Sequence, residues 1–68
     1  MMEIDKAVIA MKADKLVEYQ GQDWYILFLD QLHGICTLSN HIAGYQGTMI
    51  TKSDVRIADL KIGEKSNG

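Results

Sequence analysis

Three residues that can bind zinc, or act as a nucleophile and its base, lie close together near the middle of the chain. His33, Cys36 and His41 form the pattern His-x2-Cys-x4-His, and Asp30 stands three residues upstream. Imidazole nitrogens and a thiolate form a recognised zinc donor set. The residues between the two histidines alternate as in a strand, however, and a strand would hold the histidines at its opposite ends. We therefore predict no metal site, name His33, Cys36 and His41 as the candidate ligands, and interpret Cys36 as a small buried apolar residue.

The same group could supply a cysteine nucleophile and a histidine base, with Asn40 or Asp30 orienting the ring. A reactive thiol needs a partly exposed, electropositive setting, whereas Cys36 shares its predicted strand face with Leu38. The acidic residues are scattered rather than paired, and the segment 44–47 is too short for a phosphate-binding loop. We predict that the chain is not an enzyme and has no cofactor.

Side chains suited to recognition occur in the predicted strands and in one loop. Binding modules use exposed aromatic residues near hairpin ends. In so small a protein Trp24 and Tyr19 are interpreted as mainly structural, whereas Tyr45 lies between two glycines in the most loop-like segment. Lys52 and Arg56 share a face at period two, which indicates a basic stripe or an ordinary solvated face. The candidate binding residues are Trp24, Tyr25, His41, Tyr45, Gln46 and Arg56.

The composition predicts one folded, cytoplasmic domain. The 68 residues are 47% hydrophobic and 24% charged, which is too apolar for a disordered chain. Cys36 is the single cysteine, so an intrachain disulfide is impossible and a reducing compartment is expected. The N-terminus carries acids rather than a basic signal, and no apolar run approaches the length that crosses a bilayer. A net charge of −2 and a pI near 5.5 make nucleic acid a less favoured partner.

The elements that must position these residues are one helix and four or five antiparallel strands, which form either a sheet or a small barrel, an α+β fold. Apolar residues at i, i+4 and i+7 predict a helix over Glu3–Ala13. The predicted strands are Lys15–Gln20, Trp24–Leu29, Ile35–Ser39, Thr48–Thr51 and Asp54–Ala58, with turns at Gly21–Asp23, His33–Gly34, Lys52–Ser53 and Ala58–Leu60 and a loop over Asn40–Gly47. Within the third of these strands, Thr37 and Ser39 are predicted to face solvent.

The run Trp24–Leu29 bears on the oligomeric state. Its six apolar residues do not alternate, so both faces of this strand must be covered. The helix covers one face, and the other needs the far wall of a small barrel or a second protomer. A domain of this size normally needs extra stabilisation from a disulfide, a structural metal or a partner subunit. Because a disulfide is impossible, we expect a homo-oligomer. Residues 1–62 are expected to form the single domain, followed by a disordered polar tail over 63–68.

The segments IDKAVIAMK, KLVEYQGQDWYILFL, GICTLSN and DVRIADLKI together resemble small SH3-like β-barrel proteins encoded by phages and mobile elements of bacteria. The resemblance covers most of the chain and includes a V-x-Y-x-G hairpin opening and a closing Asp-Leu. The N-terminal helix departs from a minimal SH3 barrel. The resemblance implies an accessory protein that acts by binding, as small phage inhibitors of host defence do, some by gripping a protein and some by sequestering a nucleotide signal.

We therefore expect a non-catalytic binding module, a phage or mobile-element accessory protein that modulates or inhibits a host protein. The contact would be an exposed sheet face or the loop over 41–47. One alternative is a small-ligand or nucleotide-signal sponge with its site between protomers, where loop glycines let the backbone approach the ligand. The other is a nucleic-acid-binding domain of SH3-like or OB-like fold, which would show steep salt dependence.

Overall fold

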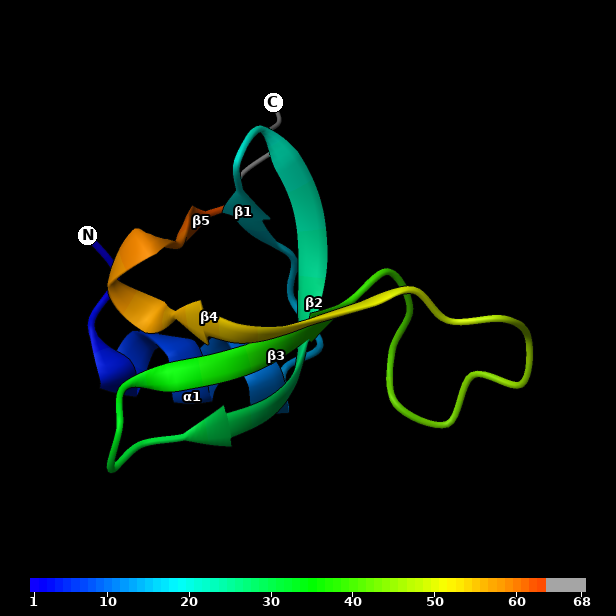
Figure 1. Cartoon of the computed structure of the whole chain (residues 1–68), viewed down its shortest axis with the longest axis horizontal. Helices are drawn as coiled ribbons and strands as arrows, with labels where there is room; N and C mark the ends of the chain where they lie inside the picture. The colour runs from blue at the N-terminus through cyan, green and yellow to red at the C-terminus, as the bar shows by residue number, and fades with distance from the viewer. Residues whose placement is uncertain (64–68) are drawn as a thin grey trace.

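The computed structural model describes residues 1–63 of the chain. The first element is helix α1 (Ile4–Lys12), and a 3₁₀ turn, η1 (Ile57–Asp59), joins the last two strands. The strands are β1 (Val17–Tyr19), β2 (Gln22–Asp30), β3 (Ile35–Ser39), β4 (Thr51–Arg56) and β5 (Lys61–Ile62). A helix followed by a five-stranded antiparallel sheet confirms the predicted α+β class (Figure 1).

The strands pair in the order β4-β3-β2-β1-β5, and every pair of neighbours is antiparallel. Strand β2 belongs to both halves of the sheet, because its start pairs with β1 and its end pairs with β3. The register shifts between Ile26 and Phe28, and a bulge at such a point bends the strand and increases its twist. The sheet does not close, so of the two predicted alternatives the antiparallel sheet is observed and the barrel is not confirmed.

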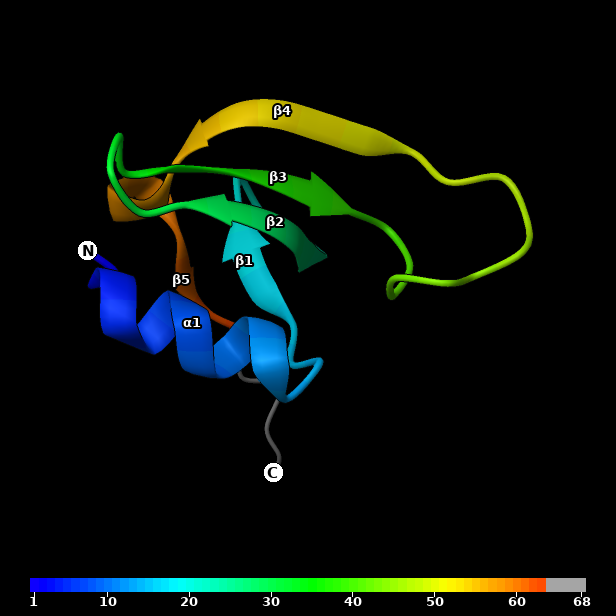
Figure 2. The ribbon, with the colours of Figure 1, turned by 90° about the horizontal axis from the view of Figure 1, so that it is seen from below.

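Helix α1 lies against β2 (Figure 2), and the helix residues that it buries are alanines. Ala7 and Ala10 are buried, and their small side chains let the helix backbone approach the sheet. Asp14 ends the helix in the left-handed region at φ 54°. Its amide donates to the Met11 carbonyl at 3.2 Å, and the Lys15 amide donates to the Ala10 carbonyl at 2.9 Å, which is a Schellman motif. Asp takes the place that glycine usually has there, since its short polar side chain tolerates this conformation.

The core forms between α1 and the sheet from residues that are far apart in the sequence. Val17, Leu38 and Leu60 are completely buried at its centre. Because these contacts join distant segments, the fold depends on tertiary packing rather than on any single element. The buried apolar residues are Met2, Ala7, Ala10, Val17, Trp24, Ile26, Cys36, Leu38, Val55, Ile57 and Leu60.

Strand β4 differs from the prediction. The sequence predicts a turn at Lys52–Ser53 between two short strands, but these residues lie inside one continuous strand. The irregularity comes later, at Asp54, which has a φ of 57° where the register with β3 shifts. A β-bulge can absorb a residue with turn-like geometry without ending the strand. Residues 48–50, predicted as strand, instead belong to the loop that precedes β4.

The orientation of two strand residues bears on the predictions. Ser39, predicted to face solvent, is completely buried because the main chain of His41 folds over its hydroxyl. Phe28 is 65% exposed, and the second protomer expected to cover it stays a prediction.

Among the described residues no helix is long and apolar enough to span a membrane. Apart from Gly63, the expected polar tail lies outside the described residues.

Candidate functional site

The loop between β3 and β4, residues 40–50, stands out from the rest of the molecule in both views (Figures 1 and 2). We call it the 40–50 loop. It contains the predicted binding residues His41, Tyr45 and Gln46. Long loops without secondary structure in small domains often carry function. The question is therefore whether this loop has a defined shape.

The two ends of the loop are joined by hydrogen bonds. The Asn40 amide donates to the Ile50 carbonyl at 3.1 Å, and the Ile50 amide donates to Asn40 Oδ1 at 2.9 Å. Next to this pair, Ser39 Oγ donates to the His41 carbonyl at 2.7 Å and accepts from the His41 amide at 3.0 Å. The side chains of Ser39 and Asn40 thus satisfy backbone groups that the sheet leaves open at this point. The base of the loop is closed.

Inside the loop, Tyr45 is held from two sides. Its ring stacks on the ring of His41, with centroids 3.7 Å apart and an angle of 18° between the planes. Its amide donates to the Ile42 carbonyl at 3.2 Å. A Cβ placed on Gly47 would lie 2.6 Å from the Tyr45 ring and hydroxyl, so the phenol end rests against the bare backbone of this glycine. Gly47 is needed at this position because of close approach and not because of its φ.

The surface of the loop is apolar and carries no formal charge. Ile42, Tyr45 and Ile50 are 43%, 45% and 59% exposed, although they are large hydrophobic residues. No Asp, Glu, Lys or Arg occurs from Gln31 to Thr51, so all of the chain's charged side chains lie outside this stretch. Depletion of charge together with exposed aromatic and aliphatic side chains is the composition found at the centre of protein interfaces. The sequence reasoning above did not use this charge-free stretch.

The three candidate zinc and nucleophile residues are not brought together. His33 lies in the β2–β3 turn, where its Nδ1 is 2.9 Å from Asp30 Oδ2 and its amide donates to Asp30 Oδ1 at 3.1 Å. The side-chain hydrogen bond from His33, and then the backbone one, lower the pKa of Asp30. Cys36 is buried within β3, and burial raises the pKa of its thiol to about 11. His41 belongs to the loop at the other end of β3, away from His33. Residues 1–63 contain no cluster of three potential metal ligands.

The other predicted binding residues lie in different places. Trp24 is in the core at 7% exposure, and its buried Nε1 has no hydrogen-bond partner among residues 1–63. Tyr25 is half-buried on β2 opposite Ser39, next to the base of the loop. Arg56 is exposed at the far end of β4, opposite Ile35. The structure therefore keeps Tyr25 near the 40–50 loop and separates Trp24 and Arg56 from it.

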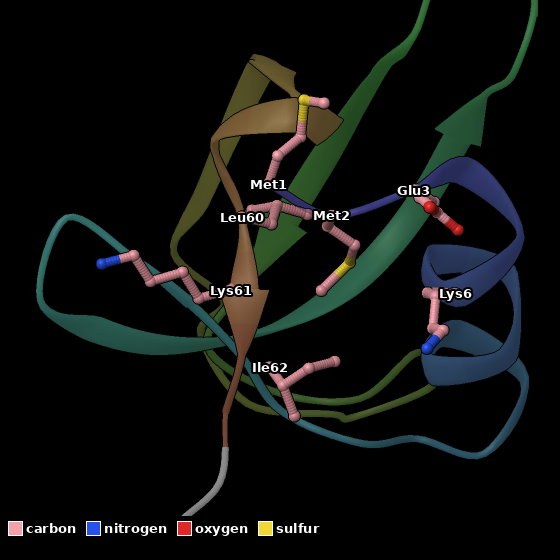
Figure 3. Close-up of a pocket in the computed structure, with 7 residues that line it drawn as sticks. All are labelled: Met1, Met2, Glu3, Lys6, Leu60, Lys61 and Ile62. Atoms are coloured by element: carbon pink, nitrogen blue, oxygen red, sulfur yellow. The ribbon is translucent and has the colours of Figure 1, made fainter.

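A hollow of about 310 Å³ lies at the end of the molecule away from the loop, between the start of α1 and β5 (Figure 3). The side chains of Met2 and Ile62 enter this space, whereas Lys61 points away from it. Its volume is at the lower limit of ligand pockets. The sequence reasoning did not predict it. The hollow is lined by Met1, Met2, Glu3, Lys6, Leu60, Lys61 and Ile62.

The chain matches no protein-family model, no curated protein and no solved structure. Of the two surface features, the 40–50 loop is the one whose shape is fixed by several independent contacts and whose side chains are of the kind that bind proteins.

Proposed function

We propose that this protein is a non-catalytic binding module that engages a protein partner through the 40–50 loop. The observation that carries the proposal is a loop that is closed at its base and braced inside, yet exposes Ile42, Tyr45 and Ile50 to solvent. Exposed apolar groups of this kind lose free energy when a partner removes them from water.

The internal contacts of the loop also reduce the entropic cost of binding. A flexible loop loses conformational freedom when it docks, and this loss weakens the complex. Here the stack of His41 on Tyr45 and the hydrogen bonds of Asn40 restrict the loop before it meets a partner. Tyrosine is, with tryptophan and arginine, one of the residue types in which the hot spots of interfaces are enriched.

The kind of partner follows from the resemblance to SH3-like barrel proteins of phages. We propose on this basis that the module is an accessory protein and that its partner is a bacterial host protein, whose activity it modulates or inhibits. The resemblance supports the host context, and the loop supports the mode of contact.

The test is capture of a partner from bacterial lysate on the immobilised protein, comparing the wild type with Tyr45→Ala. Truncating an interface hot spot costs at least about 2 kcal/mol, so the affinity for the specific partner should fall about 30-fold, measured from the retained amount at concentrations below saturation. Phe28→Ala is the matched control, because Phe28 is an even more exposed aromatic residue outside the loop. Equal loss with both variants, or none with Tyr45→Ala, would rule out the loop as the contact, provided that both variants melt like the wild type.

A second candidate function is small-ligand binding in the hollow at the α1–β5 end. The observation in its favour is the apolar space between Met2 and Ile62, which is bordered by the opposite charges of Glu3 and Lys6. A ligand that binds only the folded state raises the melting temperature by mass action. A panel of nucleotides that leaves the melting temperature of the wild type unchanged would exclude a nucleotide sponge.

A further inference from the structure

We infer that the surface recognised by the 40–50 loop is a concave, apolar site without charged groups on a protein, which receives the side chain of Tyr45. The inference rests on the proposed function and adds the chemistry of the partner's site. It follows from the charge, the shape and the rigidity of the loop.

Charge gives the first step. The nearest charged side chains along the chain are Asp30 and Lys52, and both lie in strands rather than in the loop. A charged group on the partner that was buried against the 40–50 loop would lose its hydration and meet no opposite charge. The partner surface that fits this loop at lowest cost is therefore uncharged where the two meet.

Shape gives the second step. The loop extends beyond the ends of β3 and β4 as a convex feature (Figures 1 and 2). One face of the Tyr45 ring is covered by His41, and its hydroxyl end lies against Gly47. The remaining exposed 45% of Tyr45 is directed to solvent, with Ile42 and Ile50 exposed as well. A protruding aromatic residue with aliphatic neighbours fits a pocket rather than a flat surface.

Nucleic acid does not fit the same loop. Proteins that bind DNA or RNA neutralise phosphates with Lys or Arg and release counterions, so that their affinity falls steeply with salt. Between Gln31 and Thr51 there is no such side chain. Binding through the 40–50 loop should therefore be almost independent of salt, and this property separates the two partner classes in one measurement.

The experiment introduces opposite charges at the same places in the loop. Gln46→Lys and Gln46→Glu form one pair and Thr48→Lys and Thr48→Glu a second, both at exposed positions beside Tyr45 and Gly47. Capture of the partner is measured for each variant and for the wild type, from about 0.1 M to about 1 M salt, across which the Debye length shrinks from about 10 Å to about 3 Å. Thermal melts establish that each variant is folded.

The inference expects that Lys and Glu at one position weaken capture by a similar factor, about tenfold, and that capture by the wild type changes less than about twofold with salt. Opposite effects of Lys and Glu would reveal a charged partner site and overturn the inference. So would capture that is lost with salt or on nuclease treatment, or capture that none of the four variants changes. In these cases dependence on Tyr45 leaves the proposed function standing, whereas capture that is absent in the wild type or unaffected by Tyr45→Ala removes both.

Discussion

The 40–50 loop is stabilised by one kind of contact, and the rest of the described chain, residues 1–39 and 51–63, is stabilised by another. We call this second part the body. In the body, apolar side chains from α1, the sheet and η1 pack into one core. In the loop, hydrogen bonds and one ring stack join residues that are at most ten positions apart, and large apolar side chains remain in water. We therefore expect substitutions in the loop to leave the fold intact and substitutions in the core to destabilise it.

Two aromatic residues show this difference. Trp24 and Tyr45 are both candidate binding residues by sequence, yet Trp24 is 7% exposed and Tyr45 is 45% exposed. Trp24 contributes to the hydrophobic core of a domain that, because it is small, can bury only a limited apolar area. Tyr45 is presented to solvent by His41 and Gly47. Substitution of Trp24 should therefore lower the stability of the fold, whereas substitution of Tyr45 should lower partner capture.

The largest expected effect is that of Trp24→Ala. Truncation of a buried tryptophan typically costs about 3–5 kcal/mol, which is a large part of the stability of a domain of this size. We expect chemical denaturation to show a loss of this order, and partner capture to fail only because the variant unfolds. A variant that melts like the wild type but no longer captures the partner would place Trp24 at the interface and contradict its assignment to the core.

Two glycines give the next effect, because each meets a different kind of neighbour. A Cβ on Gly63 would lie 2.7 Å from the Leu16 carbonyl oxygen, which is backbone, whereas a Cβ on Gly47 would meet only the far end of the Tyr45 side chain. Gly63→Ala should therefore lower the free energy of unfolding by about 1–2 kcal/mol, since backbone must shift. Gly47→Ala should leave the melting temperature unchanged.

In Gly47→Ala the ring should instead leave its place, which NMR contacts between His41 and Tyr45 would report. Partner capture should then fall as it does for Tyr45→Ala. If Gly47→Ala lowers global stability as much as Gly63→Ala does, the loop is a structural part of the body and the distinction is lost.

The smallest effect concerns the buried thiol of Cys36. Burial raises its pKa from an ordinary value of 9.0 to about 11, so the folded state holds this proton more tightly than the unfolded state. The resulting stabilisation is complete below pH 9 and is lost as the pH rises toward 11. At pH 10 the loss relative to pH 8 should be about 1 kcal/mol. Urea melts of wild type and Cys36→Ala at both pH values give the contribution of the thiol as a difference.

Capture of the partner at pH 8 should be the same for Cys36→Ala as for the wild type, because the thiol belongs to the body. Iodoacetamide should modify Cys36 only after denaturant is added. Rapid alkylation of the native protein would contradict the burial of this residue and reopen the prediction of a reactive cysteine.

The elements with a strong local signal were predicted well from the sequence. The period of the apolar residues identified the helix, and Gly21 located the first hairpin. The turn itself consists of Gln20 and Gly21, both with positive φ, so β2 begins at Gln22 and not at Trp24. Turn chemistry of this kind depends on two residues and is visible in the sequence, although the strand boundary shifts by a few positions.

The strand irregularities had no clear local signal. Lys52 and Ser53 look like a turn, but pairing with β3 keeps them in β4, and the bulge falls at Asp54. Whether a bulge forms depends on the partner strand, which the local pattern does not contain. The burial of Ser39 has a similar origin, because it depends on the return of the main chain at His41.

By itself the sequence determined the α+β class, the order of most elements, the loop after the third strand and the absence of charge from Gln31 to Thr51. These are properties of composition and of spacing over a few residues. Only the tertiary structure decided that Trp24 is core, that Asn40 closes on Ile50, and that Tyr45 stands on the surface beside His41. Each of these depends on which distant backbone lies opposite a residue, and that is set by strand register and by packing against the helix.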